Sequence, residues 1–106
     1  MQVGYDPRGC KAFFKKHRPA APVIRQHIAA TLARQLTHGL ARVKRASRLP
    51  YAGQTVYECR VNPPTGPLRC AFVYSDTTVT VVWLSMTIQK DVFTADLERF
   101  LKPGGG

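Results

Sequence analysis

Residues 56–61 (VYECRV) and 68–74 (LRCAFVY), which flank the turn sequence NPPTGP at 62–67, decide the fold of this 106-residue chain. Each run alternates apolar side chains with polar or small ones and is rich in residues that favour strands. The prolines and the glycine between the runs favour a reversal of the chain. We therefore predict two adjacent antiparallel strands in which Val61 pairs with Leu68.

This register predicts the constellation that bears on function. It places Arg60 opposite Arg69 and Cys59 opposite Cys70. Two opposed arginines repel one another, and the repulsion is relieved if an anion or the nearby Glu58 occupies the site. The arginine pair is therefore a candidate phosphate site, with a solvated sheet face as the alternative. We expect Arg69 to project onto the face that no helix covers. We also expect its removal to leave stability unchanged or slightly raised, because its loss relieves the repulsion from Arg60.

The remaining elements follow from local signals. Asp6 and Pro7 are typical of a helix start, and Gly39 is typical of a helix end. The expected elements are a strand at 1–5, helices at about 7–16 and 22–37, strands at 56–61, 68–74 and 78–84, and a helix at about 94–101. Their order, β-α-α-β-β-β-α, predicts an α+β fold with an N-terminal helical hairpin packed on a mostly antiparallel sheet. We expect residues 1–102 to form this single domain and residues 103–106 to form a flexible tail.

The charge of the chain is strongly asymmetric. Its 16 Lys and Arg residues against six Asp and Glu give a formal net charge of +10. Eleven of the basic residues but only one of the acids lie in residues 1–50. A basic surface of this kind attracts nucleic acid or an acidic protein. Since no apolar run is long enough for a membrane span and the N-terminus does not resemble a signal peptide, we expect a cytoplasmic protein with no membrane partner.

A cluster of basic residues falls within residues 40–54, which are expected to be irregular. Its members are Arg42, Lys44, Arg45 and Arg48. Such a segment is either a solvated loop or a surface that contacts the phosphates of RNA or of the ribosome. We expect Arg45 and Arg48 to lie on an exposed part of it.

The three cysteines and three histidines show no metal-ligand spacing, so neither a metal site nor a cofactor is predicted. Cys59 and Cys70 are expected to lie close together as buried, reduced thiols, and a cross-strand disulfide is the alternative. Trp83 lies in the most strongly β-favouring run and is expected to pack in the core rather than to stack on a nucleobase.

The order of the elements and several motifs resemble the RelE/HigB superfamily of toxins from bacterial type II toxin–antitoxin systems. The motifs are SRLP at 47–50, VYECRV at 56–61 and GPLRCAFVY at 66–74, and residues 90–101 are similar to the closing segment of the family. The resemblance implies a RelE-like, microbial-ribonuclease-like fold. It also implies metal-independent cleavage of messenger RNA on the ribosome, inhibition of translation, and neutralisation by a cognate antitoxin in a hetero-oligomer.

The resemblance also implies roles for individual residues. Arg69 matches the strand arginine that contacts the scissile phosphate, and Arg60 matches a basic position on the preceding strand. In this family the ribose 2′-hydroxyl attacks the adjacent phosphate, and basic side chains align it and offset the developing charge.

Three features depart from the pattern of RelE-type members. Glu58 stands where they carry a second basic residue, although in other ribonucleases a glutamate is the general base. Phe93 lies near the position of their stacking tyrosine, and residues 85–89 contain no arginine. Lys90 and Asp91 are candidate substitutes, because HigB-type members carry polar residues near this segment. The candidate catalytic residues are therefore Arg69, Arg60, Glu58 and Lys90.

Two alternatives stay open. The missing tyrosine and arginine favour a protein of the same fold that lacks the chemistry, either a ParE-like toxin that inhibits DNA gyrase or a degenerate RNA- or ribosome-binding module. An unrelated basic protein-interaction domain is the second alternative. A neighbouring gene for a small acidic or DNA-binding partner would support the toxin hypotheses.

Overall fold

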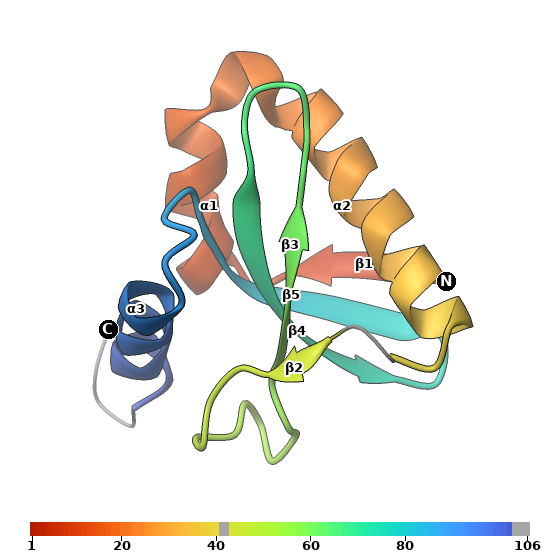
Figure 1. The fold of residues 1–106 in the computed structure, drawn as a ribbon, viewed down its shortest axis with the longest axis vertical. Helices are drawn as coiled ribbons and strands as arrows, with labels where there is room; N and C mark the ends of the chain where they lie inside the picture. The colour runs from red at the N-terminus through yellow and green to blue at the C-terminus, as the bar shows by residue number, and fades with distance from the viewer. Residues whose placement is uncertain (41–42, 103–106) are drawn as a thin grey trace.

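The computed structural model describes residues 1–40 and 43–102 (Figure 1). Within them, a five-stranded mixed sheet has the strand order β1-β5-β4-β3-β2. The strands are β1 (Gln2–Tyr5), β2 (Lys44–Arg45), β3 (Tyr57–Val61), β4 (Leu68–Ser75) and β5 (Thr78–Ser85). The helices are α1 (Pro7–Lys16), α2 (Ala21–Thr37) and α3 (Lys90–Leu101), with a short 3₁₀ helix, η1 (Arg18–Ala20), between the first two. These elements form an α+β fold, and the tail expected at 103–106 lies outside the described residues.

The antiparallel pairing of β3 with β4 confirms the register expected from the turn. The cross-strand partners include Val61 and Leu68, Arg60 and Arg69, and Cys59 and Cys70. In the turn, the N–H of Gly66 donates to the carbonyl oxygen of Pro63 at 3.0 Å. Gly66 has a φ of 121°, a conformation that residues with a side chain rarely adopt, so this glycine helps to fix where the chain reverses.

The sheet is one strand wider than expected and is mixed. β1 pairs with β5 in parallel, whereas the other pairings are antiparallel. The additional strand, β2, pairs with β3 inside the segment that was expected to be irregular. In the tight turn between β4 and β5, Asp76 has a φ of 52°, a left-handed conformation that aspartate adopts more readily than most residues.

The two N-terminal helices begin and end close to the predicted residues. Asp6 caps α1, because its Oδ1 accepts a hydrogen bond from the N–H of Arg8 at 2.8 Å, and Pro7 is the first helical residue. Just beyond α2, Gly39 has a φ of 66°, as expected after a helix end. The helices diverge from their connection (Figure 1), so the predicted hairpin is an open V rather than a pair of closely packed helices.

Helices pack on both faces of the sheet. The core on the α1 and α2 face consists of Cys10, Phe14, Ile24, Ile28, Leu32, Cys59, Val61, Leu68, Cys70, Phe72, Val79, Val81 and Leu84. α3 packs on the opposite face, where Phe93 and Leu97 are fully buried. The expectation that no helix covers the face of Arg69 is therefore wrong. α3 begins at Lys90 rather than at 94, and both Phe93 in the additional turn and Leu97 within the predicted range are buried against this face. The order of the elements did not indicate on which face this helix packs.

Gly9 sets the distance between α1 and β5. A Cβ atom at this position would overlap the carbonyl oxygen of Val82, so the helix lies this close only because residue 9 is glycine. We predict that Gly9→Ala lowers the free energy of unfolding by about 2–3 kcal/mol, measured by urea denaturation, because the helix must move off the strand. Gly4→Ala is the control, since a Cβ at Gly4 has nothing within 4 Å, and its effect should stay below about 0.5 kcal/mol. Equal losses in the two variants would contradict this account of the packing.

Candidate functional site

The centre of the candidate site is an ion pair between neighbouring strands. Nη1 of Arg69 on β4 donates to Oε1 of Glu58 on β3 at 3.1 Å. Nε of Arg69 donates to the carbonyl oxygen of Ile88, between β5 and α3, at 2.6 Å. The side chain of Glu58 is 2% exposed and that of Arg69 is 22% exposed. The guanidinium group is therefore held by two partners on a side chain that still reaches solvent.

The side chain of Glu58 faces Arg69 rather than open solvent. Its second oxygen, Oε2, is buried and has no hydrogen-bond partner among the described residues. A general base must come within hydrogen-bond reach of the proton that it removes, and a side chain exposed by only 2% offers little surface for that approach in the free protein. Of the two roles considered for Glu58, the geometry favours the charge partner of an arginine over the general base.

Arg60 lies opposite Arg69, but the two side chains bind different groups. Arg60 is exposed, and its Nε donates to Oδ1 of Asn62 at 3.1 Å, whereas Arg69 turns to Glu58. Repulsion between the arginines is therefore relieved within the protein. Loss of Arg69 would leave the buried carboxylate of Glu58 without a cation, which typically costs about 3–5 kcal/mol. Arg69 was expected to be dispensable for stability because it would repel Arg60. Since the two side chains bind different groups, that reason no longer applies.

The basic residues of β2 divide between the two faces of the sheet. Side chains of directly paired residues on neighbouring strands lie on the same face. Lys44 pairs with Glu58, so it lies on the face of Arg69. Arg45 pairs with Tyr57 and lies on the opposite face. Both side chains are exposed, as was expected for Arg45, but the two residues belong to a strand and not to a loop.

The other residues expected at the site lie farther along the chain. Arg48 is exposed in the loop after β2, and its N–H donates to Oε2 of Glu98 on α3 at 3.4 Å. Lys90 is exposed at the start of α3, two residues beyond Ile88. Within the described residues, no polar contact joins Arg48 or Lys90 to the ion pair. Arg42 lies outside the described residues.

One sheet face therefore brings together part of the predicted set. Its members are Lys44, Glu58, Arg60 and Arg69. Phe93, on the side of α3 that faces the sheet, has no exposed surface, so it does not offer a ring on which a base could stack. This face presents a group of cations, of which Arg69 is held by two hydrogen bonds. Such a group can bind phosphate. The carbonyl of Ile88, which fixes Arg69, had no signal in the sequence because any residue supplies a carbonyl.

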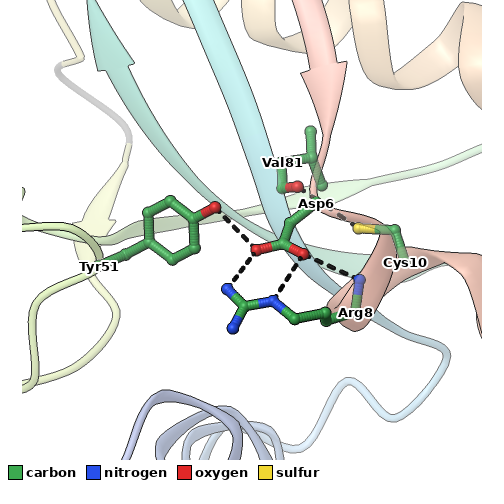
Figure 2. A network of polar contacts seen from close by, with 5 residues as sticks. All are labelled: Asp6, Arg8, Cys10, Tyr51 and Val81. Atoms are coloured by element: carbon green, nitrogen blue, oxygen red, sulfur yellow. Dashed lines mark hydrogen bonds and ion pairs between the residues drawn. The ribbon is translucent and has the colours of Figure 1, made fainter. Parts of the chain in front are cut away.

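A second polar network ties the loop after β2 to α1 (Figure 2). Oδ2 of Asp6, a residue 5% exposed, accepts hydrogen bonds from the hydroxyl of Tyr51 at 2.7 Å and from Nη2 of Arg8 at 2.9 Å. Burial alone would raise the pKa of Asp6, but the hydrogen bonds from Arg8 and Tyr51 outweigh it and hold the pKa below its ordinary value. The sequence revealed only the helix cap, because Tyr51 is 45 residues away.

The cysteines lie within the core. Cys59 and Cys70 are cross-strand partners, which confirms that they lie close together, and all three cysteines are free. The hydrogen bond with Cys59, together with burial, raises the pKa of Cys70 well above its ordinary value. Burial raises the pKa of Cys10 to about 12, and its thiol donates to the carbonyl oxygen of Val81 at 3.4 Å (Figure 2).

Among residues 1–40 and 43–102, no three His, Cys, Asp or Glu side chains gather in a group that could hold a metal ion. None of the helices in this part of the chain combines the length and apolar character needed to cross a bilayer.

Comparison with known proteins gives no relative. No protein-family model matches the chain, and neither the curated proteins nor the solved structures contain a match. The resemblance to RelE/HigB toxins therefore stays a hypothesis that depends on the motifs and on the arrangement of the site.

The Asp6 network leads to a prediction about acid stability. A carboxylate with a lowered pKa stabilises the fold above its unfolded-state pKa of about 3.9, and this contribution is lost as the pH falls through the folded-state value. We predict that Asp6→Asn, which keeps a cap, unfolds at neutral pH with a free energy about 1–2 kcal/mol lower than the parent. The difference should shrink as the pH falls below about 4, measured by urea denaturation at several pH values.

The matched control for this prediction is Asp76→Asn. Asp76 is exposed, and asparagine readily adopts its left-handed conformation, so stability should change by less than about 0.5 kcal/mol. If the Asp6→Asn difference were the same at pH 7 and at pH 2, the ionised network would not be its source.

Proposed function

We propose that the protein is the toxin of a type II toxin–antitoxin pair and acts as an RNA-cleaving inhibitor of translation, as RelE/HigB proteins do. The observation that carries the proposal is the fixed guanidinium of Arg69. It is held by Glu58 and by the carbonyl of Ile88, and Arg60 and Lys44 lie on the same sheet face. A preorganised cation site of this kind suits a phosphate group better than a set of freely moving surface lysines.

The proposed reaction needs charge stabilisation more than a metal. The 2′-oxygen of a ribose attacks the adjacent phosphorus, the bond from phosphorus to the 5′-oxygen breaks, and a cyclic phosphate and a 5′-hydroxyl form. The proton lost by the 2′-hydroxyl balances the proton gained by the 5′-oxygen. Arg69 and Arg60 offset the negative charge that develops on the phosphate, using guanidinium donors that their protein partners leave free.

A net charge of +10 on 106 residues supports both proposed partners. Messenger RNA on the ribosome presents dense negative charge, and a small antitoxin with an acidic segment would neutralise the same surface in a toxin–antitoxin hetero-oligomer. Both interactions would be weakened by salt, because contacts to the phosphates of RNA release condensed counterions and because salt screens the charge pairs formed with an acidic protein.

A second candidate function keeps the binding surface and omits the cleavage. Its support is the burial of Glu58, because the carboxylate bonded to Arg69 is 2% exposed and offers little surface to a substrate. The burial of Phe93 adds to this, since no ring is offered from that position. Under this hypothesis the protein is a ParE-like inhibitor of DNA gyrase or an RNA- or ribosome-binding module.

The decisive variants act on the ion pair. Because Arg69→Ala leaves Glu58 unpaired and destabilises the fold, we use Arg69→Lys, which keeps the positive charge but loses the forked geometry. We predict that induced Arg69→Lys protein accumulates in folded form but inhibits bacterial growth far less than the parent. New messenger RNA 5′ ends, mapped after induction, should fall by about 100-fold, the scale of a lost transition-state donor.

The control variant is Glu58→Gln, which keeps the shape of the side chain but removes its charge. If Glu58 only holds Arg69, cleavage should fall about tenfold or less, because the hydrogen bond to the guanidinium is kept. A complete loss of cleavage in folded Glu58→Gln protein would make Glu58 a general base. Growth inhibition without new RNA ends, together with loss of gyrase supercoiling activity, would replace the ribonuclease proposal by the gyrase-type one.

A further inference from the structure

A groove that the proposed reaction does not use lies beside the ion pair. A hollow of about 330 Å³ separates α1 from the end of β5, and a second of about 400 Å³ lies between α1, β5 and α3. The two hollows share Arg8 and Trp83, and we call them together the α1 groove. The lining of the α1 groove includes basic and aromatic side chains, among them Arg8, Phe13, Lys16, His17, Trp83 and Phe100.

Aromatic rings line this groove. Trp83 packs against the core on the α3 face, as expected, but it is only half-buried, and its ring lies against that of Phe100 at 5.2 Å between centroids. The buried indole Nε1 of Trp83 has no hydrogen-bond acceptor within the described part of the chain. Phe13, on the α1 side, is also half-buried. Exposed aromatic surface of this kind suits a planar ligand such as a nucleobase.

Cations surround the rings. Arg8 is 75% exposed, is tethered to Asp6, and lies 5.6 Å above the ring of Phe100. Lys16 is exposed at the last turn of α1. The acid that lines the groove, Asp96, is already bonded to Arg99 at 3.3 Å. With Arg8 paired to Asp6 and Arg99 paired to Asp96, the groove keeps the positive charge of Lys16 next to apolar rings. Positive charge beside exposed rings is the combination by which proteins bind single-stranded nucleic acid.

The groove lies close to the strand that carries Arg69. Ser85 at the end of β5 lines the groove, and it is also the cross-strand partner of Arg69. Residues 85–87 line the groove, and the next residue, Ile88, supplies the carbonyl that holds the guanidinium. One short segment of the chain thus borders both the groove and the guanidinium of Arg69.

We propose that the α1 groove binds a single-stranded segment of the same RNA, with a base against the rings of Trp83 and Phe13 and phosphates at Arg8 and Lys16. The choice of RNA as the ligand rests on the proposed function, in which RNA is the substrate. Binding in the groove does not depend on cleavage. An acidic peptide would match the charge of the groove but would leave its rings without a planar partner, so the combination favours a nucleotide ligand.

The experiment compares two charge reversals on α1. Lys16→Glu and Lys15→Glu change the net charge equally, both positions are exposed, and Lys16 lines the groove whereas Lys15 is not part of its lining. A fluorescently labelled, 2′-O-methylated RNA hexanucleotide, which cannot be cleaved, is titrated with each purified variant. We expect Lys16→Glu to bind it about tenfold more weakly than Lys15→Glu does.

Trp83 gives a second measurement, since it is the single tryptophan of the chain. Unlabelled hexanucleotide should quench its emission in the parent protein, at concentrations that match the binding curve. The proposal would be overturned if the two lysine variants lost RNA affinity equally and RNA did not quench the emission of Trp83 in the parent protein. A hexaglutamate peptide that competes as well as the RNA would also overturn it, because the groove would then bind any anion.

The Arg69→Lys variant separates this proposal from the proposed function. In Arg69→Lys protein, RNA should still quench the emission of Trp83 even where cleavage is lost. Adding Lys16→Glu to this variant should still weaken RNA binding more than adding Lys15→Glu does. If cleavage is never found but the groove still binds the hexanucleotide, the ribonuclease proposal fails and the groove proposal stands. If cleavage depends on Arg69 but Lys16→Glu matches Lys15→Glu, the groove proposal alone fails.

Discussion

The ion pair between Glu58 and Arg69 is the interaction on which the rest of the candidate site depends. A carboxylate exposed by only 2% is costly unless a cation neutralises it, and Arg69 is the cation that meets it at 3.1 Å. This constraint directs the guanidinium towards Glu58 and away from Arg60, which would otherwise repel it. A buried charge thus converts an unfavourable arrangement of two opposed arginines into a fixed guanidinium group, which is the candidate phosphate site.

Much of the fold could be predicted because its signals are local. The turn with Gly66 set the register of β3 and β4, and Asp6 with Pro7 set the start of α1. β2 could not be predicted, since two exposed basic residues carry no strand pattern and pair only because β3 offers a free edge. The start of α3 was predicted four residues too late. The packing of α3 on the sheet face that carries Arg69 was not predicted.

The candidate site was predictable in its residues but not in its contacts. Arg69, Arg60 and Glu58 were identified from the register, yet their partners are set by tertiary packing that sequence does not encode locally. The loop after β2 is a further example. It is held at one end by Tyr51 on Asp6 and at the other by Ser47, whose hydroxyl donates to Glu98 at 2.8 Å. These long-range contacts hold the loop against α1 and α3, and the tether from Asp6 also keeps Arg8 beside the groove.

The central claim is that Arg69, held by Glu58, binds a phosphate of RNA, and the salt dependence of RNA binding tests it most directly. The double variant Glu58→Gln with Arg69→Met removes both charges, so it leaves the net charge unchanged and no carboxylate unpaired. We predict that it folds, binds RNA more weakly, and has a slope of log K against log salt smaller by about one than the parent, the loss of one phosphate contact. An unchanged affinity and slope in the folded double variant would contradict the claim.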